Sequence, residues 1–328
     1  MKKLLLIAIS LFLVMSLLSC GADLGDATDA LTTEEITTEA LESTEAAEET
    51  TEGATEEPVT EAEDTYPGAS DPLLAKIAQH IAESDNYLIF SIGDSLTEGQ
   101  GATVYAEFDY TAMFTKKLGE VFSSKSVYRV DGKRNATSTG IDYPDTAVTI
   151  QEGSGNGAIT VARCGIGGNT VKRIINRSSD FIGKEIQGQT GNLFIISSGI
   201  NDSFNGDKEK YATPLQYKQN LNTLIDMIYA THPDADIILM TPTYVHNNNL
   251  DYGKSLNSYA NYMKAVASDR NIACIDLHAL WMNHYVEGAI NFGQGDWLNS
   301  NTTDSCHPSN VGHEAIATEM IRCLFGIN

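Results

Sequence analysis

Four short segments of the sequence carry polar residues near predicted strand ends. The first three contain glycines and follow apolar runs, and the fourth lies beyond a loop after the last such run. In chain order they are Gly93-Asp94-Ser95-Leu96, Gly168-Asn169-Thr170, Gly199-Ile200-Asn201-Asp202 and Asp304-Ser305-Cys306-His307-Pro308. Together these blocks hold an alcohol, an imidazole, a carboxylate and hydrogen-bond donors. Those are the groups that a serine hydrolase needs.

The chemistry of such a site gives each group a role. A serine hydroxyl is a weak nucleophile at neutral pH and needs a base, which His307 can be for Ser95. Asp304 can hold the imidazole in the required tautomer and stabilise its cation. The tetrahedral oxyanion needs preorganised donors, and the N–H groups of Ser95 and Gly168 and the amide of Asn201 can supply them. A glycine at 168 would also leave room for the acyl carbon.

The runs between these blocks predict an α/β domain. Apolar and β-branched runs predict strands at 87–92, 159–163, 193–198, 236–241 and 272–277, and helical patterns occur at 71–83, 110–122, 170–175, 215–230, 255–268 and 311–325. This alternation predicts a parallel sheet with helices on both faces, and residues 124–160 read as an inserted hairpin or irregular excursion. Ligands meet such sheets at the carboxyl ends of the strands, where the blocks lie.

In this order the four blocks resemble the SGNH hydrolases, also called the GDSL esterase/lipase family, whose blocks contribute Ser, Gly, Asn and His. The resemblance extends from about residue 88 to 317. It implies a flavodoxin-like three-layer α/β/α sandwich around a five-stranded parallel sheet, without a metal or other cofactor. It also implies Ser95 as nucleophile, His307 as base, Asp304 as its orienting group, and Ser95, Gly168 and Asn201 as the oxyanion hole.

Structural roles compete with these catalytic ones. The α/β-hydrolase family is a poorer match, because its G-x-S-x-G elbow is not present around Ser95. Taken alone, Ser95 could cap a helix or turn, and Asn201 could brace a turn. We expect Asp202 to stabilise its own loop. We expect Asp94 to accept backbone N–H hydrogen bonds next to the catalytic residues without contacting the substrate. The remaining histidines are expected on the surface or in the core: His80, His232, His246, His278, His284 and His313.

Two groups of aromatic residues flank the blocks. Trp281, Tyr285, Phe292 and Trp297 precede the histidine block, and Tyr105, Phe108 and Tyr110 follow the serine block. Each group could form a platform for stacking on sugars or could pack a loop against the core, and the sequence leaves both open.

The N-terminus predicts export. Lys2 and Lys3 precede an apolar run, so residues 1–19 read as a signal peptide. Leu17-Leu18-Ser19-Cys20 resembles a bacterial lipoprotein signal, which implies lipid attachment at Cys20 and anchoring to the cell membrane with the domain facing the exterior. The alternative is an ordinary signal peptide in which Cys20 is incidental.

Residues 20–68 differ in composition from the rest. Positions 21–66 hold 16 acidic residues and no Lys or Arg, which predicts a disordered, Thr/Glu-rich linker, with helical Glu-Ala stretches as the alternative. Of the total net charge of −23, the remainder from 67 onward carries −9, with 28 acidic and 19 basic residues. This balance argues against a nucleic-acid partner. Residues 69–328 are expected to form one hydrolase domain.

Four cysteines remain in that domain, and their spacing matches neither a disulfide framework nor a zinc site. Buried thiols and bridges such as Cys306–Cys323 or Cys164–Cys274 both stay open.

The sequence thus predicts an exported, lipid-anchored serine esterase that removes short acyl groups, most often acetyl, from a polysaccharide or glycan. A lipase or lysophospholipase is the first alternative. An inactive glycan-binding lipoprotein is the second, and the intact Ser–Gly–Asn–His set argues against it. The oligomeric state is left open.

Overall fold

The computed structural model of the chain describes residues 68–204, 207, 209–245, 251–287, 297 and 306–327. The predicted signal peptide, Cys20, nearly all of the predicted linker, Phe292 and Asp304 lie outside the described residues. Within the described part no helix is both long and apolar enough to cross a membrane.

The described chain forms a seven-stranded sheet in the order β5-β2-β6-β1-β7-β8-β9. Neighbouring strands are parallel except β5, which pairs antiparallel with β2. The strands are β1 Asn86–Gly93, β2 Ser126–Asp131, β5 Val148–Gln151, β6 Ala158–Gly165, β7 Gly191–Ser197, β8 Asp236–Met240 and β9 Ala273–Ile275. A separate pair, β3 Lys133–Arg134 and β4 Ile141–Asp142, is antiparallel.

All five predicted strands are present, but the predicted count of five was wrong. The segment 124–160 is not only an excursion, because it contributes β2 as a parallel strand of the main sheet and β5 as its edge. The sequence concealed β2 because it carries charges at buried positions. Arg129 is 6% exposed, and its Nε lies 3.0 Å from Asp131. Burying a charge is unfavourable, so buried strands are mostly apolar, but the ion pair offsets that free-energy cost here.

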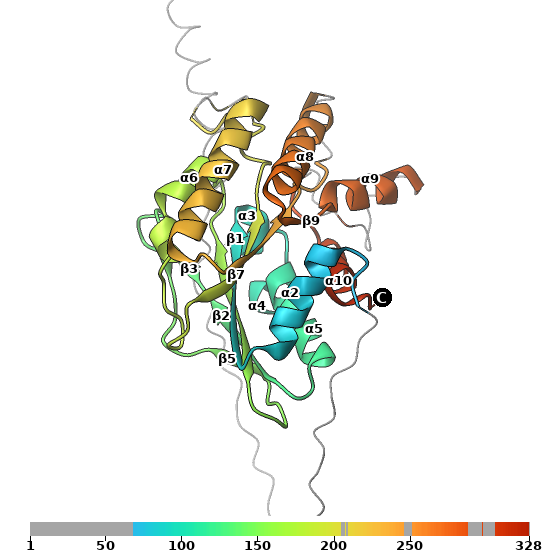
Figure 1. Cartoon of the computed structure of the whole chain (residues 1–328). Coiled ribbons are helices and arrows are strands. Elements are labelled where there is room, and N and C mark those ends of the chain that lie inside the picture. The colour runs from blue at the N-terminus through green and yellow to red at the C-terminus, as the bar shows by residue number, and fades with distance from the viewer. Residues whose placement is uncertain are drawn as a thin grey trace, which may run out of the picture. The chain divides into compact units, whose positions relative to one another are not determined.

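Helices cover both faces of the sheet, as the predicted three-layer sandwich requires (Figure 1). On one face lie α2 Pro72–Glu83, α5 Tyr110–Val121 and α10 Asn310–Phe325. On the other lie α6 Val171–Asn176, α7 Pro214–Thr231 and α8 Asp251–Arg270. Further helical segments, which the sequence patterns did not predict, are α3 Ser95–Glu98, α4 Tyr105–Phe108, α9 Leu277–Glu287 and the 3-10 turn Ser178–Asp180.

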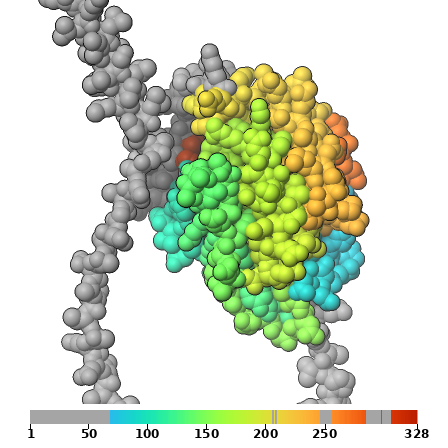
Figure 2. Space-filling model, turned by 90° about the vertical axis from the view of Figure 1, so that its left-hand side faces the viewer, coloured from blue at the N-terminus to red at the C-terminus, as the bar shows by residue number. Residues whose placement is uncertain are grey.

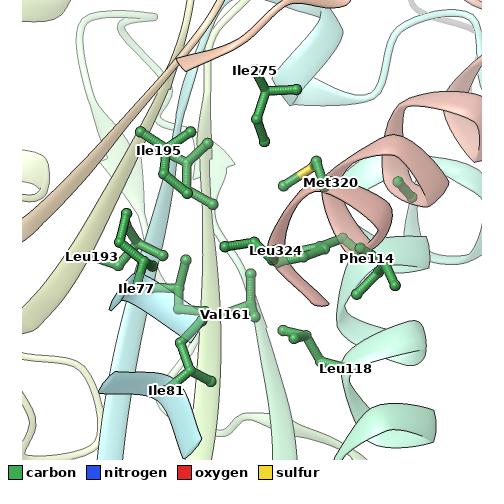
Figure 3. Packing of buried hydrophobic residues seen from close by; sticks show 14 of the residues in the cluster. Ile77, Ile81, Phe114, Leu118, Val161, Leu193, Ile195, Ile275, Met320 and Leu324 are labelled. Atoms are coloured by element: carbon green, nitrogen blue, oxygen red, sulfur yellow. The ribbon is translucent and has the colours of Figure 1, made fainter. Parts of the chain in front are cut away.

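The core has two halves because side chains alternate along each strand. Val161, Leu193 and Ile195 point toward α2, α5 and α10, where they meet Leu118 and Leu324 (Figure 3). The intervening residues of the same strands belong to a second buried cluster against α6, α7 and α8: Ala162, Phe194 and Ile196. Strands buried on both faces explain why these runs are almost wholly apolar.

Capping residues fix where the helices begin. Asp71 accepts hydrogen bonds from two N–H groups in the first turn of α2, and Thr213 and Gln216 form a capping box on α7. Ser309 caps α10 by accepting from the N–H of Gly312. This cap determines where the chain enters the core just after His307.

Candidate active site

Ser95 lies where β1 ends and a single helical turn begins. Asp94 caps this turn, since its Oδ1 accepts a hydrogen bond from the N–H of Leu96 at 3.0 Å. Ser95 is the first residue of α3, and the turn ends at Gly99 in the left-handed conformation. The Gly-Asp-Ser-Leu block therefore forms a strand-to-helix turn at the carboxyl edge of the sheet, and its serine is 7% exposed.

His307 lies beside this serine, with its Nε2 2.9 Å from the Oγ of Ser95. The segment that follows α3 packs directly against the histidine block. Gly101 has φ +97°, and a side chain there would collide with the carbonyl oxygen of Pro308. Asn310 at the start of α10 accepts from the N–H of Thr103 at 2.9 Å. The structure thus brings the predicted alcohol and imidazole together, although 212 residues separate them.

Asp304 lies outside the described residues, so its role beside His307 stays a prediction. Among described groups, the thiol of Cys306 lies 3.6 Å from the Nδ1 of His307.

Gly168 lies in the loop between β6 and α6, and this loop rests on α3. The N–H of Gly167 donates to Oε2 of Glu98 at 2.7 Å, and Arg134 binds the same carboxylate through Nε and Nη2 at 2.9 and 2.5 Å. Gly168 has φ +77°, which favours glycine, whereas an added Cβ would meet no atom closer than 3.8 Å. The backbone conformation, not crowding by the protein, explains the glycine.

Asn201 connects the first two blocks to the third. Its Nδ2 donates to the carbonyl of Asn169 at 3.0 Å and lies 3.4 Å from Oδ2 of Asp94. Asp94 therefore accepts hydrogen bonds behind the serine, as expected. The structure gathers Ser95, Asn169, Asn201 and His307 around the end of β1.

Two buried carboxyl groups lie beneath this arrangement. Both carboxylate oxygens of Asp202 lie within 3.3 Å of the backbone nitrogen of Val171. The side chain thus has a structural role, but it supports the start of α6 and not its own loop as expected. Burial raises the pKa of Asp202 to about 8, with a further contribution from the charge of Asp94. Burial also raises the pKa of Asp94 to about 6, although hydrogen bonds and His307 oppose the shift.

Arg177, which the sequence patterns did not single out, forms hydrogen bonds to the ends of both β1 and β6. It is 4% exposed and donates to the carbonyls of Gly93 and Cys164 at 3.1 and 3.0 Å. Its Nε donates to Oδ1 of Asn169 at 2.7 Å. The only signal in the sequence is an arginine shortly after the second block, at the end of a predicted helix.

His313 has a structural role. Its Nδ1 accepts from the N–H of Tyr110 at 3.2 Å, and its Nε2 contacts the carbonyl of Gln100 at 3.1 Å. Burial lowers the pKa of His313 to about 4, so the ring is neutral and donates from Nε2. It ties α10 to the segments that follow Ser95.

The sequence left two roles open for the aromatic residues, stacking on sugars or packing against the core, and their exposure differs. Trp281 is fully buried and packs edge-on against Trp297 with ring centroids 4.9 Å apart, and Tyr110 is 1% exposed. These rings pack loops and helices against the core. Tyr105 is exposed and stays available as a contact surface.

The cysteines of the domain are thiols, so neither of the two bridges left open by the sequence is formed: Cys164, Cys274, Cys306 and Cys323. Across the described ranges, no group of three or more His, Cys, Asp or Glu side chains could hold a metal ion.

Comparison with known proteins agrees with this geometry. The family described as GDSL-like Lipase/Acylhydrolase matches residues 89–320. The structure resembles Axe2, an acetylxylan esterase from Geobacillus stearothermophilus, with a TM-score of 0.52 and 23% identity over 74% of this chain and 95% of that one. A catalytic mutant of the same enzyme gives a TM-score of 0.51 and 22% identity over 73% of this chain and 94% of that one.

No curated protein sequence matches the chain. The two structural likenesses support the fold alone, because their identity is low. The family match, however, spans most of the chain and all four blocks. The chain therefore belongs to the GDSL-like lipase/acylhydrolase family, and is a serine hydrolase acting on ester bonds.

Proposed function

We propose that the protein is an exported carbohydrate esterase that removes short acyl groups, most often acetyl, from a polysaccharide or glycan. The observation that carries its catalytic part is the 2.9 Å contact between Ser95 Oγ and His307 Nε2 at the carboxyl edge of the sheet. This separation suits proton transfer from a nucleophile to its base.

In the proposed reaction, Ser95 Oγ attacks the ester carbonyl while its proton passes to His307 Nε2. The N–H groups of Ser95 and Gly168 stabilise the oxyanion, and Asn201 joins them when its Nδ2 exchanges the 3.4 Å contact with Asp94 for one to the oxyanion. When the carbon–oxygen bond to the sugar breaks, His307 protonates the leaving alcohol and an acyl-enzyme remains. Water then gives a proton to His307 and attacks, which releases the acid and restores Ser95. Asp304 would orient the imidazole throughout.

Two observations favour a sugar over a lipid as the alcohol part. A cavity of about 610 Å³ lies beside the Gly168 loop, and most of its lining residues carry hydroxyl, amide or guanidinium groups, including Ser138, Thr139 and Asn176. Such groups suit sugar hydroxyls better than a hydrocarbon chain. In addition, Axe2, which shares the fold, is described as an acetylxylan esterase.

The proposed location follows from the predicted N-terminus. Acyl chains on Cys20 would anchor the protein, and the acidic segment up to residue 68 would hold the domain away from an anionic membrane.

A substrate screen tests the function. We expect release of acetate from acetylated glycans and faster turnover of p-nitrophenyl acetate than of p-nitrophenyl octanoate. Ser95→Ala should abolish both activities, whereas Ser154→Ala, a matched change at an exposed serine, should not. A preference for octanoyl esters or lysophospholipids would reject the carbohydrate assignment, and turnover by Ser95→Ala would reject the nucleophile.

A further inference from the structure

Two basic side chains lie on the open side of Gly168, the residue proposed to donate to the oxyanion. A Cβ built on Gly168 would lie 3.8 Å from Nζ of Lys210 and 3.9 Å from Nη1 of Arg173. Arg173 also donates through Nη1 to the carbonyl of Gly168 at 3.2 Å. Two cations thus lie next to the point at which the substrate carbonyl would bind.

The charges of these two residues are only partly compensated. Nζ of Lys210 lies 3.4 Å from the partly exposed carboxylate of Asp207. For Arg173, the described part of the chain offers no carboxylate within ion-pair distance. The rest of the Arg173 guanidinium therefore remains open to a ligand.

The cavity beside this loop continues the positive surface. Among the described residues, its lining includes Arg134, Arg173 and Arg177 and no acidic side chain. Glu98 binds Arg134, and Asp180 lies 3.4 Å from Arg177, so Arg173 is the least compensated of the three. Figure 2 shows the face on which the green segment from β3 to β4 adjoins the yellow-green segment around α6, and both segments contribute to this lining.

This concentration of cations contrasts with the domain as a whole, where acidic residues exceed basic ones by 28 to 19 from residue 67 onward. Holding like charges close together is unfavourable unless an anion compensates them. Arg177 has a structural explanation, since it binds two strand ends. Within the part of the chain that the structure describes, Arg173 and Lys210 have no comparable set of backbone contacts.

We propose that the substrate sugar carries a carboxylate close to the acylated hydroxyl, as a hexuronic acid does, and that Arg173 and Lys210 bind it. A guanidinium matches a carboxylate through paired N–H donors, and the ammonium of Lys210 adds a point charge. The hydroxyls of Ser138 and Thr139 can contact the same sugar chain. This inference rests on the proposed function and specifies its substrate class.

A kinetic comparison tests it. The substrates are acetylated hexuronic acid oligomers and acetylated xylo-oligosaccharides, and the measured quantity is the ratio of their kcat/KM values. In the wild type we expect a ratio of at least about tenfold in favour of the acidic oligomers, which falls as salt screens the charges. Arg173→Gln and Lys210→Gln should each reduce the ratio about tenfold, mainly through KM. Lys172→Gln, at an exposed position of the same helix, should leave the ratio unchanged.

Using a ratio removes any general effect of Arg173→Gln on the Gly168 loop, since that effect would slow both substrates alike. A binding measurement then separates this inference from the proposed function. The Ser95→Ala protein should bind non-acetylated hexuronic acid trimers at least about tenfold more tightly than xylotriose by calorimetry, and Arg173→Gln should remove the difference.

Equal affinities for the two trimers, or a ratio that neither substitution changes, would overturn the anionic subsite even if acetyl esters are cleaved. Tight binding of the acidic trimer without ester cleavage would support the subsite and count against the esterase. Stronger inhibition by glycerophosphate than by the acidic trimer would assign the cations to a phosphate ester and overturn the sugar acid.

Discussion

The hydroxyl of Ser95 owes its position to the residues on either side of it. Gly93 ends β1, Asp94 turns the chain and caps α3, and His307 reaches the hydroxyl from the segment before α10. Because the serine is almost buried, a hydrogen bond from its hydroxyl to the imidazole is not weakened by competing water.

The buried carboxyl groups near the serine give the folded protein a distinctive pH response. Asp202 is fully buried, and burial raises its pKa to about 8, while an unfolded aspartate titrates near 4. Between these values the folded state holds a proton that the unfolded state releases. The contribution of Asp202 to stability is therefore present below about pH 4 and is lost as the pH rises through about 8.

Asp202→Asn tests this response, because asparagine imitates the protonated carboxyl and can still accept from Val171. We expect the free energy of unfolding of the variant, relative to the wild type, to increase as the pH rises from 5 to 8, by up to about 1.4 kcal/mol per pH unit. Denaturant unfolding at each pH measures it, with the exposed Asp85→Asn as control. A difference independent of pH would contradict the assigned proton.

At the scale of elements, the buried side chain of Arg177 forms hydrogen bonds to several of the segments that position the catalytic groups. Arg177, at the end of α6, binds the carbonyls that terminate β1 and β6 and the side chain of Asn169. Asn201 then binds the carbonyl of Asn169. The strand ends and the loops that carry Ser95, Gly168 and Asn201 are thereby joined by hydrogen bonds.

Replacing Arg177 by methionine should remove its hydrogen bonds to these carbonyls and to Asn169, which costs about 3 kcal/mol of unfolding free energy. We also expect kcat for p-nitrophenyl acetate to fall about a hundredfold while KM changes little, because the oxyanion donors lose their fixed positions. Arg177→Lys should recover part of the stability and little of kcat. If both variants keep wild-type kcat, the connection does not position the site.

The elements that the sequence predicted are those with a strong local signal. The five apolar strands were found because they are buried on both faces, and the longer helices have clear caps. The strand β2 was missed because Arg129 and Asp131 pair with each other inside the fold. Ion pairs of this kind form through folding and leave no periodic pattern.

The residues of the site also differ in whether they leave a local signal in the sequence. Ser95 and Asn201 could be predicted because each follows an apolar run, and His307 because its block completes the ordered set. Arg173 and Lys210 could not, because only the folded chain brings them to Gly168. A further reason for Gly168 was also hidden, since a positive φ is a property of the loop conformation.

For the molecule as a whole, charge separates two regions of the chain. Positions 21–66 carry 16 acidic residues without a basic one, whereas most of the cations follow within the hydrolase domain. We expect this acidic segment to repel an anionic membrane and so to extend outward from an anchor at Cys20.

The anchor is tested by Cys20→Ser. In cells that lipidate exported proteins, the wild type should sediment with membranes and the variant should appear in the soluble fraction, since two or more acyl chains are needed for stable attachment. Cys323→Ser, a change at another thiol, serves as the control. Equal retention of wild type and Cys20→Ser would exclude the lipid anchor.

The central claim is that Ser95 is a nucleophile activated by His307, and covalent labelling tests it most directly. A fluorophosphonate that reacts with activated serines is incubated with the protein, and the modified peptide is identified by mass spectrometry. We predict an adduct on Ser95 in the wild type, none in Ser95→Ala, and labelling at least about a hundredfold slower in His307→Ala. Labelling that persists in Ser95→Ala, or an unchanged rate in His307→Ala, would contradict the account.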